Sequence, residues 1–313
     1  MNFAMKRVKQ QRQSFLSEKI GHFLAREACL AANSRTERNK AAELKARSLP
    51  LGRYSVHVKK GYDLFDLAQR AIDEAETSGK DIVSGSLWAA DELTHAKGRF
   101  NRTWHAPQGG AYFVLAIYPN LERSYWSLYT LACGVAIAQI IREWGCDAGV
   151  RWINDVLLHG KKIAGVLTKS YQARLSRQTY LLLGIGINVN TASFPDHLPE
   201  AGSLFLETGK RWPIWDLASH IIARLGWLIA SAEQWEAEQI KGLDECDTLC
   251  NPIVYAWKRC NVTLKRPISF GYNIEQEVEF TGIAHSMEQD GSLNIVLESG
   301  EMVNMNSGEI RFL

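Results

Sequence analysis

The sequence has no paired cysteines and no long apolar run, and each of these two absences excludes a class of protein. Its six cysteines are scattered, and only Cys246 and Cys250 lie close together. This spacing fits neither a disulfide framework nor a zinc site with paired ligands, so a reducing cytoplasm is the expected location. No apolar run is long enough for a signal-peptide core or a membrane span.

The net charge of +2 over 313 residues argues neither for nor against a nucleic-acid partner. The charge is uneven, because residues 1–47 hold eleven Lys or Arg against four Glu, which leaves the remaining chain net acidic. The length exceeds one average domain, so two or three units are expected. Residues 1–50 are helical in composition and predict a basic, solvated helical arm or a disordered one.

Residues 151–170 read RWINDVLLHGKKIAGVLTKS and predict a β-hairpin. An apolar strand leads to a polar turn at His159 and Gly160, and Lys161 opens the second strand. Gly165 lies inside that second strand, where a missing side chain often marks the close approach of a ligand or another backbone. A solvated sheet edge is the alternative interpretation of this stretch taken alone.

Two other stretches favour a binding site. Residues 94–110 read THAKGRFNRTWHAPQGG, which is too polar for core and too rich in Gly and cations for a plain turn. Flexible backbone with guanidinium groups at fixed spacing suits the binding of phosphates and carboxylates. Residues 181–190 read LLLGIGINVN, a buried strand whose Gly184 and Gly186 fall on one face by period-two alternation.

In this order, the basic loop ending in Trp104, then R-W-x-N-D with K-K-I-A-G-V-L, then G-I-G-I-N-V-N resemble the motifs of biotin protein ligases. The resemblance implies an α+β fold: a mixed sheet backed by helices, of the class II synthetase-like kind, followed by a small SH3-like β-barrel. It also implies activation of biotin by ATP as an acyl-adenylate. Mg²⁺ then shares the charge of the leaving phosphates, and the acceptor is a lysine of a biotin carboxyl carrier protein.

Adenylation must hold two anions, the acid and the α-phosphate, within bonding distance, and fixed cations are the simplest way to do so. By resemblance, Lys162 lies beside both anions and Arg99 closes the loop on the intermediate, so both are predicted to be catalytic. Trp104 is predicted to cover the adenine and Asn188 to contact its edge. The predicted substrate-binding residues are Lys97, Gly98, Arg102, Asn154, Asp155, Gly165, Gly184 and Gly186. No protein metal ligand is predicted.

Three departures from the family pattern open alternatives. The loop usually reads G-R-G-R-x-G-R, yet here Ala96 and Asn101 replace two glycines, and Lys97 replaces an arginine and loses its bidentate fork. A Ser-Thr-Asn triplet that binds the biotin ring is replaced by residues 63–65, Asp-Leu-Phe, and a ring-binding Gln is replaced by Leu93. Unpaired ring donors would cost about 1–3 kcal/mol each. A ligase or transferase for lipoate, octanoate or another acid, and a non-catalytic ligand-sensing regulator, are therefore the alternatives.

The expected domains are the arm at 1–50, a catalytic domain at 51–259 and the SH3-like domain at 260–313. Periodicity predicts helices at 62–76, 125–144 and 214–238, and strands at 82–89, 111–118 and 181–190. Beyond Cys260, strands are predicted at 262–265, 277–284, 292–298 and 301–305, with a hairpin turn at Asp290 and Gly291. Ser34, Arg35 and Thr36 faintly resemble a DNA-binding helix-turn-helix, but no apolar three-helix pattern surrounds them. DNA and membrane are not expected partners, and a homodimer is possible.

Overall fold

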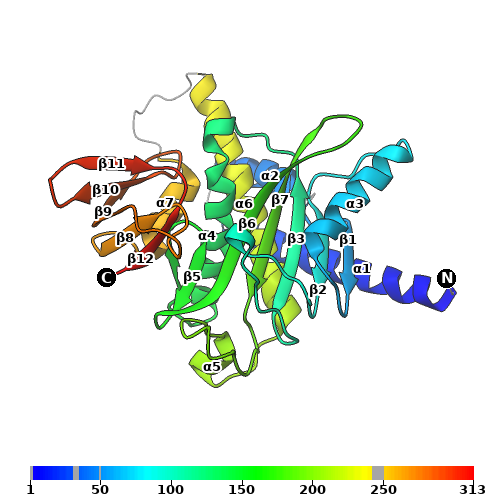
Figure 1. Cartoon of the computed structure of the whole chain (residues 1–313). Coiled ribbons are helices and arrows are strands. Elements are labelled where there is room, and N and C mark those ends of the chain that lie inside the picture. The colour runs from blue at the N-terminus through cyan, green and yellow to red at the C-terminus, as the bar shows by residue number, and fades with distance from the viewer. Residues whose placement is uncertain (1–2, 31–34, 49–50, 242–249) are drawn as a thin grey trace.

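The computed structural model describes residues 3–30, 35–48, 51–241 and 250–313, with side chains from residue 16 onward outside 31–38. The chain forms a seven-stranded sheet with helices on both faces, and a separate five-stranded antiparallel sheet near the C-terminus (Figure 1). This confirms the expected α+β architecture with a small C-terminal β domain.

The large sheet has the strand order β1-β2-β3-β7-β6-β5-β4. β1 and β2 are parallel and the other neighbours are antiparallel, so the sheet is mixed. Every residue of β3 is buried, because helices cover both faces of the central strands. The strands are β1 (Ser55–Val58), β2 (Ser86–Ala90), β3 (Ala111–Ile117), β4 (Gly149–Arg151), β5 (Asp155–Leu158), β6 (Lys161–Gln172) and β7 (Thr179–Ile187).

The helices divide between the two faces of this sheet. α4 (Ser127–Glu143) and α6 (Ile214–Ile240) pack on one face, where α7 (Pro252–Cys260) also contributes buried residues. α3 (Leu64–Thr77) packs on the opposite face, and the Asp63 side chain caps it by accepting a hydrogen bond from the Phe65 backbone N–H. The short α5 (Leu204–Thr208) and the 3-10 turns η1 (Arg99–Asn101) and η2 (Arg123–Tyr125) lie in connections.

The segment Arg123–Glu143, which contains α4, is long and apolar enough to cross a membrane by length and composition alone. The expectation that no run reaches this length is therefore wrong for this segment. Of its most apolar window, 67% is buried inside the fold. Packing against the sheet and α6 gives a structural reason for the apolar composition.

The N-terminal helices α1 (Phe3–Leu30) and α2 (Arg35–Ser48) pack against α6. Leu16, Ile20 and Leu24 recur every four residues on α1 and are buried in the main core. Arg224 of α6 adds two hydrogen bonds to the Glu27 carboxylate, at 2.8 and 2.9 Å. The predicted helical character of the N-terminal segment is confirmed over 3–30 and 35–48, but the segment is not a solvated arm, because its basic composition hides an apolar stripe that packs into the core. The side chains of residues 34–36, which resemble a DNA-binding motif, lie outside the described residues.

The C-terminal sheet has the strand order β11-β10-β9-β8-β12. The turn at Asp290 and Gly291 is confirmed, with Gly291 at φ +84°. The strand predicted at 262–265 is wrong: Thr263 is buried, and its hydroxyl accepts a hydrogen bond from the Trp152 backbone N–H at 2.9 Å. This segment fastens the C-terminal sheet to the hairpin. The strands are β8 (Pro267–Gly271), β9 (Phe280–Met287), β10 (Leu293–Leu297), β11 (Met302–Met305) and β12 (Glu309–Phe312).

Candidate active site

A cavity of about 440 Å³ lies between the large sheet, the start of α3, the loop at 93–105 and the C-terminal sheet. Strands, loops and the hairpin each contribute to its wall. Every residue predicted to bind substrate or nucleotide, or to act in catalysis, lines this cavity. They are Lys97, Gly98, Arg99, Arg102, Trp104, Asn154, Asp155, Lys162, Gly165, Gly184, Gly186 and Asn188. The sequence therefore located one site, while the role of each residue stays a prediction.

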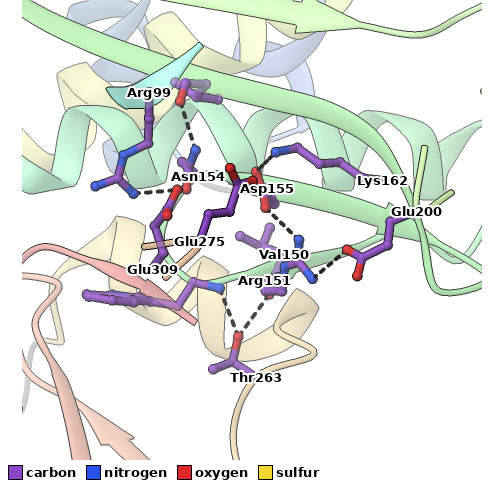
Figure 2. Close-up of polar contacts among 12 residues, drawn as sticks. Arg99, Val150, Arg151, Asn154, Asp155, Lys162, Glu200, Thr263, Glu275 and Glu309 are labelled. Carbon is purple, nitrogen blue, oxygen red and sulfur yellow. Dashed lines mark hydrogen bonds and ion pairs between the residues drawn. The ribbon is translucent and has the colours of Figure 1, made fainter. Parts of the chain in front are cut away.

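Strands β4 and β6, on either side of β5, place two cations on one buried carboxylate (Figure 2). Lys162 Nζ lies 2.6 Å from Asp155 Oδ1, and Arg151 donates to Asp155 Oδ2 at 2.8 Å. Burial alone would raise the pKa of Asp155, but the charges of Lys162 and Arg151 hold it below its ordinary value. Arg151 also approaches Glu200 at 3.6 Å. Asp155 therefore stays ionised and fixes the position of the Lys162 ammonium.

The turn of the hairpin of β5 and β6 explains why Lys162 faces the cavity. His159 and Gly160 both have positive φ, at 51° and 80°, as a two-residue type I′ turn requires. The turn pairs Leu157 with Lys162, and a register shift between Val156 and Leu157 then sets Asp155 opposite Gly165 on β6. The turn and this shift together bring Asp155 of β5 and Lys162 of β6 close enough to pair.

Arg99 reaches the same region from the basic loop. Its guanidinium donates to the Gly308 carbonyl at 2.7 Å. It also donates to Asn154 Oδ1 at 3.5 Å (Figure 2), while Asn154 Nδ2 donates to the Val166 carbonyl at 3.1 Å. Burial lowers the pKa of Arg99, which as an arginine remains charged. Asn101, which replaces a family glycine, has φ +61°, a left-handed geometry that Asn tolerates. The loop thus keeps its shape without that glycine.

Trp104 lies against the glycine face of β6 and β7. A Cβ atom at Gly165 would lie 2.9 Å from the Trp104 ring, and one at Gly186 would lie 2.6 Å from its Nε1 atom. The Lys162 ammonium lies 5.6 Å from the ring centroid. Both glycines are therefore required by the position of the indole, whose Nε1 atom has no hydrogen-bond partner among the described residues.

Asn188, one residue beyond β7, is 2% exposed and lines the same cavity. Its Nδ2 atom donates to the Gly202 carbonyl at 2.9 Å. Its Oδ1 atom is buried and accepts no hydrogen bond within the described part of the chain. An oriented, unused acceptor in a cavity is what an amino group of a base would require.

The other end of the cavity is apolar, with one charged pair. Gly184 lies two residues before Gly186 on the same face, and a Cβ atom there would lie 2.3 Å from the Phe65 ring. Leu64, Leu93 and Ala96 also line the cavity. Among them, the Asp63 carboxylate lies 2.5 Å from the Lys97 ammonium. Contact with Asp63, more than with Asp66, raises the pKa of Lys97.

Arg102 points from the loop to the C-terminal sheet. Its guanidinium contacts the carboxylates of Glu275, at 2.9 Å, and of Glu309. Both glutamates line the cavity and were not found from the sequence, since nothing in their own neighbourhood marks a residue that pairs across the domains. In this structure Arg102 links the basic loop to the C-terminal domain through these ion pairs. Its predicted contact with substrate stays a prediction.

Residues 70–188 match the model of the Biotin/lipoate A/B protein ligase family. The chain is 35% identical over 166 residues to the bifunctional ligase/repressor BirA of Bacillus subtilis, covering 51% of this chain and 50% of that protein. The chain is also 28% identical over 260 residues to the biotin--[acetyl-CoA-carboxylase] ligase of Mycobacterium tuberculosis, covering 77% of this chain and 84% of the relative.

Solved structures of the family share the fold. The biotin protein ligase from Aquifex aeolicus in complex with biotin and ATP superimposes with a TM-score of 0.64 at 23% identity, covering 83% of this chain and 99% of that one. The chain spans about half the length of the Bacillus BirA proteins that it matches. The chain thus shares the fold of these structures and is similar in sequence to the biotin/lipoate ligase family over residues 70–188, while its reaction has to be argued from its site.

Proposed function

We propose that this protein activates biotin with ATP as an acyl-adenylate and transfers the biotinyl group to a lysine of a biotin carboxyl carrier protein. The observation that carries the proposal is the meeting of Lys162 and Arg99, from separate segments, around the Asn154 and Asp155 pair in one cavity. Fixed cations at such a site stabilise the charge that builds during attack on a phosphate.

In the first step a carboxylate oxygen of the acid bonds to the α-phosphorus of ATP, and diphosphate leaves as the bond to the β-phosphate oxygen breaks. The Lys162 ammonium, held by Asp155, donates to the phosphate and to the acid oxygen. Arg99 supplies the second positive charge from the loop, so both cations are in place before the reaction begins.

In the second step the neutral amine of the acceptor lysine attacks the carbonyl carbon of the mixed anhydride. AMP leaves with the bonding electron pair, the amide loses a proton, and no external reductant or oxidant is needed. The covering loop, fastened to the C-terminal sheet by Arg99 and Arg102, would keep water from the intermediate meanwhile.

Trp104 would cover the adenine, and the free Oδ1 atom of Asn188 would accept a hydrogen bond from its edge. Mg²⁺ would enter with ATP, because it is usually held by one or two carboxylates together with substrate phosphates. The site fits this mode, since no three His, Cys, Asp or Glu side chains gather into a metal cage within the described part of the chain. Mg²⁺ would supply charge neutralisation on the leaving phosphates.

The comparisons support biotin as the acid and a carboxylase carrier as the acceptor. The M. tuberculosis relative is named as a biotin--[acetyl-CoA-carboxylase] ligase, and the A. aeolicus structure contains biotin and ATP. A cytoplasmic location and a homodimer remain predictions from the sequence.

A second candidate is the activation of another acid, such as lipoate or octanoate. Phe65 and Leu93 favour it, because they present carbon where the family presents ring-binding polar groups. A sensor without catalysis is disfavoured, since such a protein has little use for both Lys162 and Arg99 at the phosphate end.

Acid-dependent exchange of labelled diphosphate into ATP tests the proposal, with biotin, lipoate and octanoate supplied separately. We expect exchange with biotin. Exchange with lipoate or octanoate alone would favour the second candidate. Absence of exchange with every acid, in protein that still binds ATP, would contradict adenylation and favour the sensor.

A further inference from the structure

The apolar end of the cavity contains a buried carboxylate that helix capping does not account for. The Asp63 side chain is 1% exposed. Its Oδ1 atom caps α3 by accepting a hydrogen bond from the Phe65 N–H at 2.8 Å. Its Oδ2 atom is also buried, lies 2.5 Å from the Lys97 ammonium and has no further hydrogen-bond partner among the described residues. Ser or Asn would cap equally well without burying a second charged oxygen.

The apolar surroundings make this ion pair energetically unfavourable unless further hydrogen bonds stabilise it. Leu64, Phe65 and Leu93 line the cavity beside it, and a carboxylate in such surroundings loses several kcal/mol of hydration. Lys97 compensates part of this loss, but its side chain is 42% exposed and it is shared with Asp66 at 3.0 Å. An ammonium has three donors and a carboxylate about four acceptor positions, so both retain unused hydrogen-bonding capacity.

The pair also lies at a defined place relative to the cations at the other end. Trp104 covers Gly186 and Phe65 covers Gly184, two residues further along the same face of β7. Two residues of a strand span about 7 Å. Phe65, two residues after Asp63, therefore contacts the strand roughly 7 Å from the contact of Trp104, the ring beside Lys162.

Resting on the proposed function, we infer that Asp63 and Lys97 recognise a neutral head group with an N–H and a C=O side by side, a cyclic urea or lactam, at the end of the acid opposite its carboxylate. The carboxylate of Asp63 accepts from the N–H and the ammonium of Lys97 donates to the C=O. Such a head group satisfies both partners of the ion pair at once.

Other head groups fit the pair less well. A cationic head would be repelled by Lys97 and an anionic head by Asp63. An alkyl or disulfide tail would displace water from both charges and return no hydrogen bond, which is the more costly outcome for buried polar groups. Phe65 and Leu93 would then pack against the carbon of the ring. Asp63 and Lys97 thus take the place of the ring-binding Ser-Thr-Asn and Gln side chains of the family motifs, which this sequence lacks.

The test is equilibrium binding, without ATP, of desthiobiotin, which carries a cyclic urea and no sulfur ring, compared with octanoate. The variants are Asp63→Asn, which keeps an N-cap oxygen, and the control Asp66→Asn. The control removes the other negative charge that faces the same lysine, at a residue that does not line the cavity. Thermal unfolding checks that both variants fold. We expect the wild type to bind desthiobiotin at least tenfold more tightly than octanoate.

Asp63→Asn should raise the Kd of desthiobiotin at least tenfold and that of octanoate less than threefold. Asp66→Asn should change either Kd less than threefold. Octanoate binding as tightly as desthiobiotin to the wild type would overturn the inference. Equal weakening of both ligands by Asp63→Asn would also overturn it, since that result indicates a purely structural cap. The binding test contains no ATP, so it is independent of adenylation. If the protein showed no diphosphate exchange but still bound desthiobiotin more tightly than octanoate, only the proposed adenylation would be contradicted.

Discussion

The Lys162 ammonium lies 2.6 Å from one oxygen of the Asp155 carboxylate, and the other oxygen accepts a hydrogen bond from Arg151 at 2.8 Å. Asp155 is buried at the start of β5, so it positions a cation without reaching far into the cavity itself. The relationship links two sequence motifs, N-D and K-K-I-A-G, through the register of one hairpin.

Asp155 should make the folded state lose stability in acid. Its pKa in the folded state lies below the ordinary value of 3.8, because Lys162 and Arg151 outweigh the effect of burial. The unfolded state therefore takes up the proton at a higher pH than the folded state. The stabilisation from this carboxylate is complete above that ordinary value and is lost as the pH falls below it.

The variant Asp155→Asn should thus lower the free energy of unfolding at pH 7 by about 2–4 kcal/mol, because two partly buried cations lose their partner. Urea unfolding at pH 7 and at pH 3 measures the difference between variant and wild type. We expect this difference to shrink at pH 3. A difference that is the same at both pH values would show that the carboxylate is not the ionised partner described above.

Gly186→Ala should impair nucleotide binding. The new Cβ atom would lie 2.6 Å from Trp104 Nε1, so the indole has to leave its place on the sheet. We expect the Kd of ATP, measured by calorimetry, to rise at least tenfold. Gly21→Ala in α1, with nothing within 4 Å of the new Cβ atom, is the control and should leave the Kd unchanged. Unchanged ATP binding with weakened acid binding would mean that Trp104 covers the acid instead.

Arg102 should act by fastening the basic loop to the C-terminal sheet. Glu309→Gln removes one of its two ion-pair partners and leaves the arginine free to contact substrate. If fastening is its role, Arg102→Ala and Glu309→Gln should raise the KM of ATP by similar factors of about three to ten, because a partly exposed ion pair contributes about 1 kcal/mol. High salt should reduce both effects. A large effect of Arg102→Ala alone would assign the arginine to substrate binding.

Leu24→Ala should destabilise the whole protein, since α1 is part of the main core. Leu24 is 1% exposed, and removing a buried leucine side chain costs about 2–5 kcal/mol. Urea unfolding monitors this change. Leu30→Ala, at the end of the same helix and 60% exposed, is the control and should cost less than about 0.5 kcal/mol. Equal effects of the two variants would mean that α1 does not contribute to the core.

The predictions from sequence were most accurate where local chemistry determines structure. The turn at His159 and Gly160 and the period-two placement of Gly184 and Gly186 depend on neighbouring residues, and the structure has both features, with the two β7 glycines lining the cavity. The predicted strand at 262–265 failed, because Thr263 uses its hydroxyl in a tertiary hydrogen bond to the hairpin. Its local β propensity was overridden by a contact 111 residues away.

The pairing of residues across the fold was not predictable. Asp63 stands at a helix cap, and its local sequence explains only its bond to the Phe65 N–H. The approach of Lys97 depends on how the basic loop folds back over α3. The contacts of Arg102 with Glu275 and Glu309 likewise depend on the docking of a separate sheet. Patterns in a sequence report which face is apolar, and they do not report which charges meet.

Biotin-dependent exchange of diphosphate into ATP, measured for Lys162→Ala beside Lys161→Ala, tests the central claim most directly. Lys161 is the adjacent lysine and donates to the Pro199 carbonyl at the surface. Removing a group that stabilises transition-state charge typically costs 100-fold or more in rate. We predict that Lys162→Ala loses at least about 100-fold while folding normally and that Lys161→Ala stays within about threefold. Exchange by folded Lys162→Ala at the wild-type rate would contradict the assignment of this cavity as an acid-activating site.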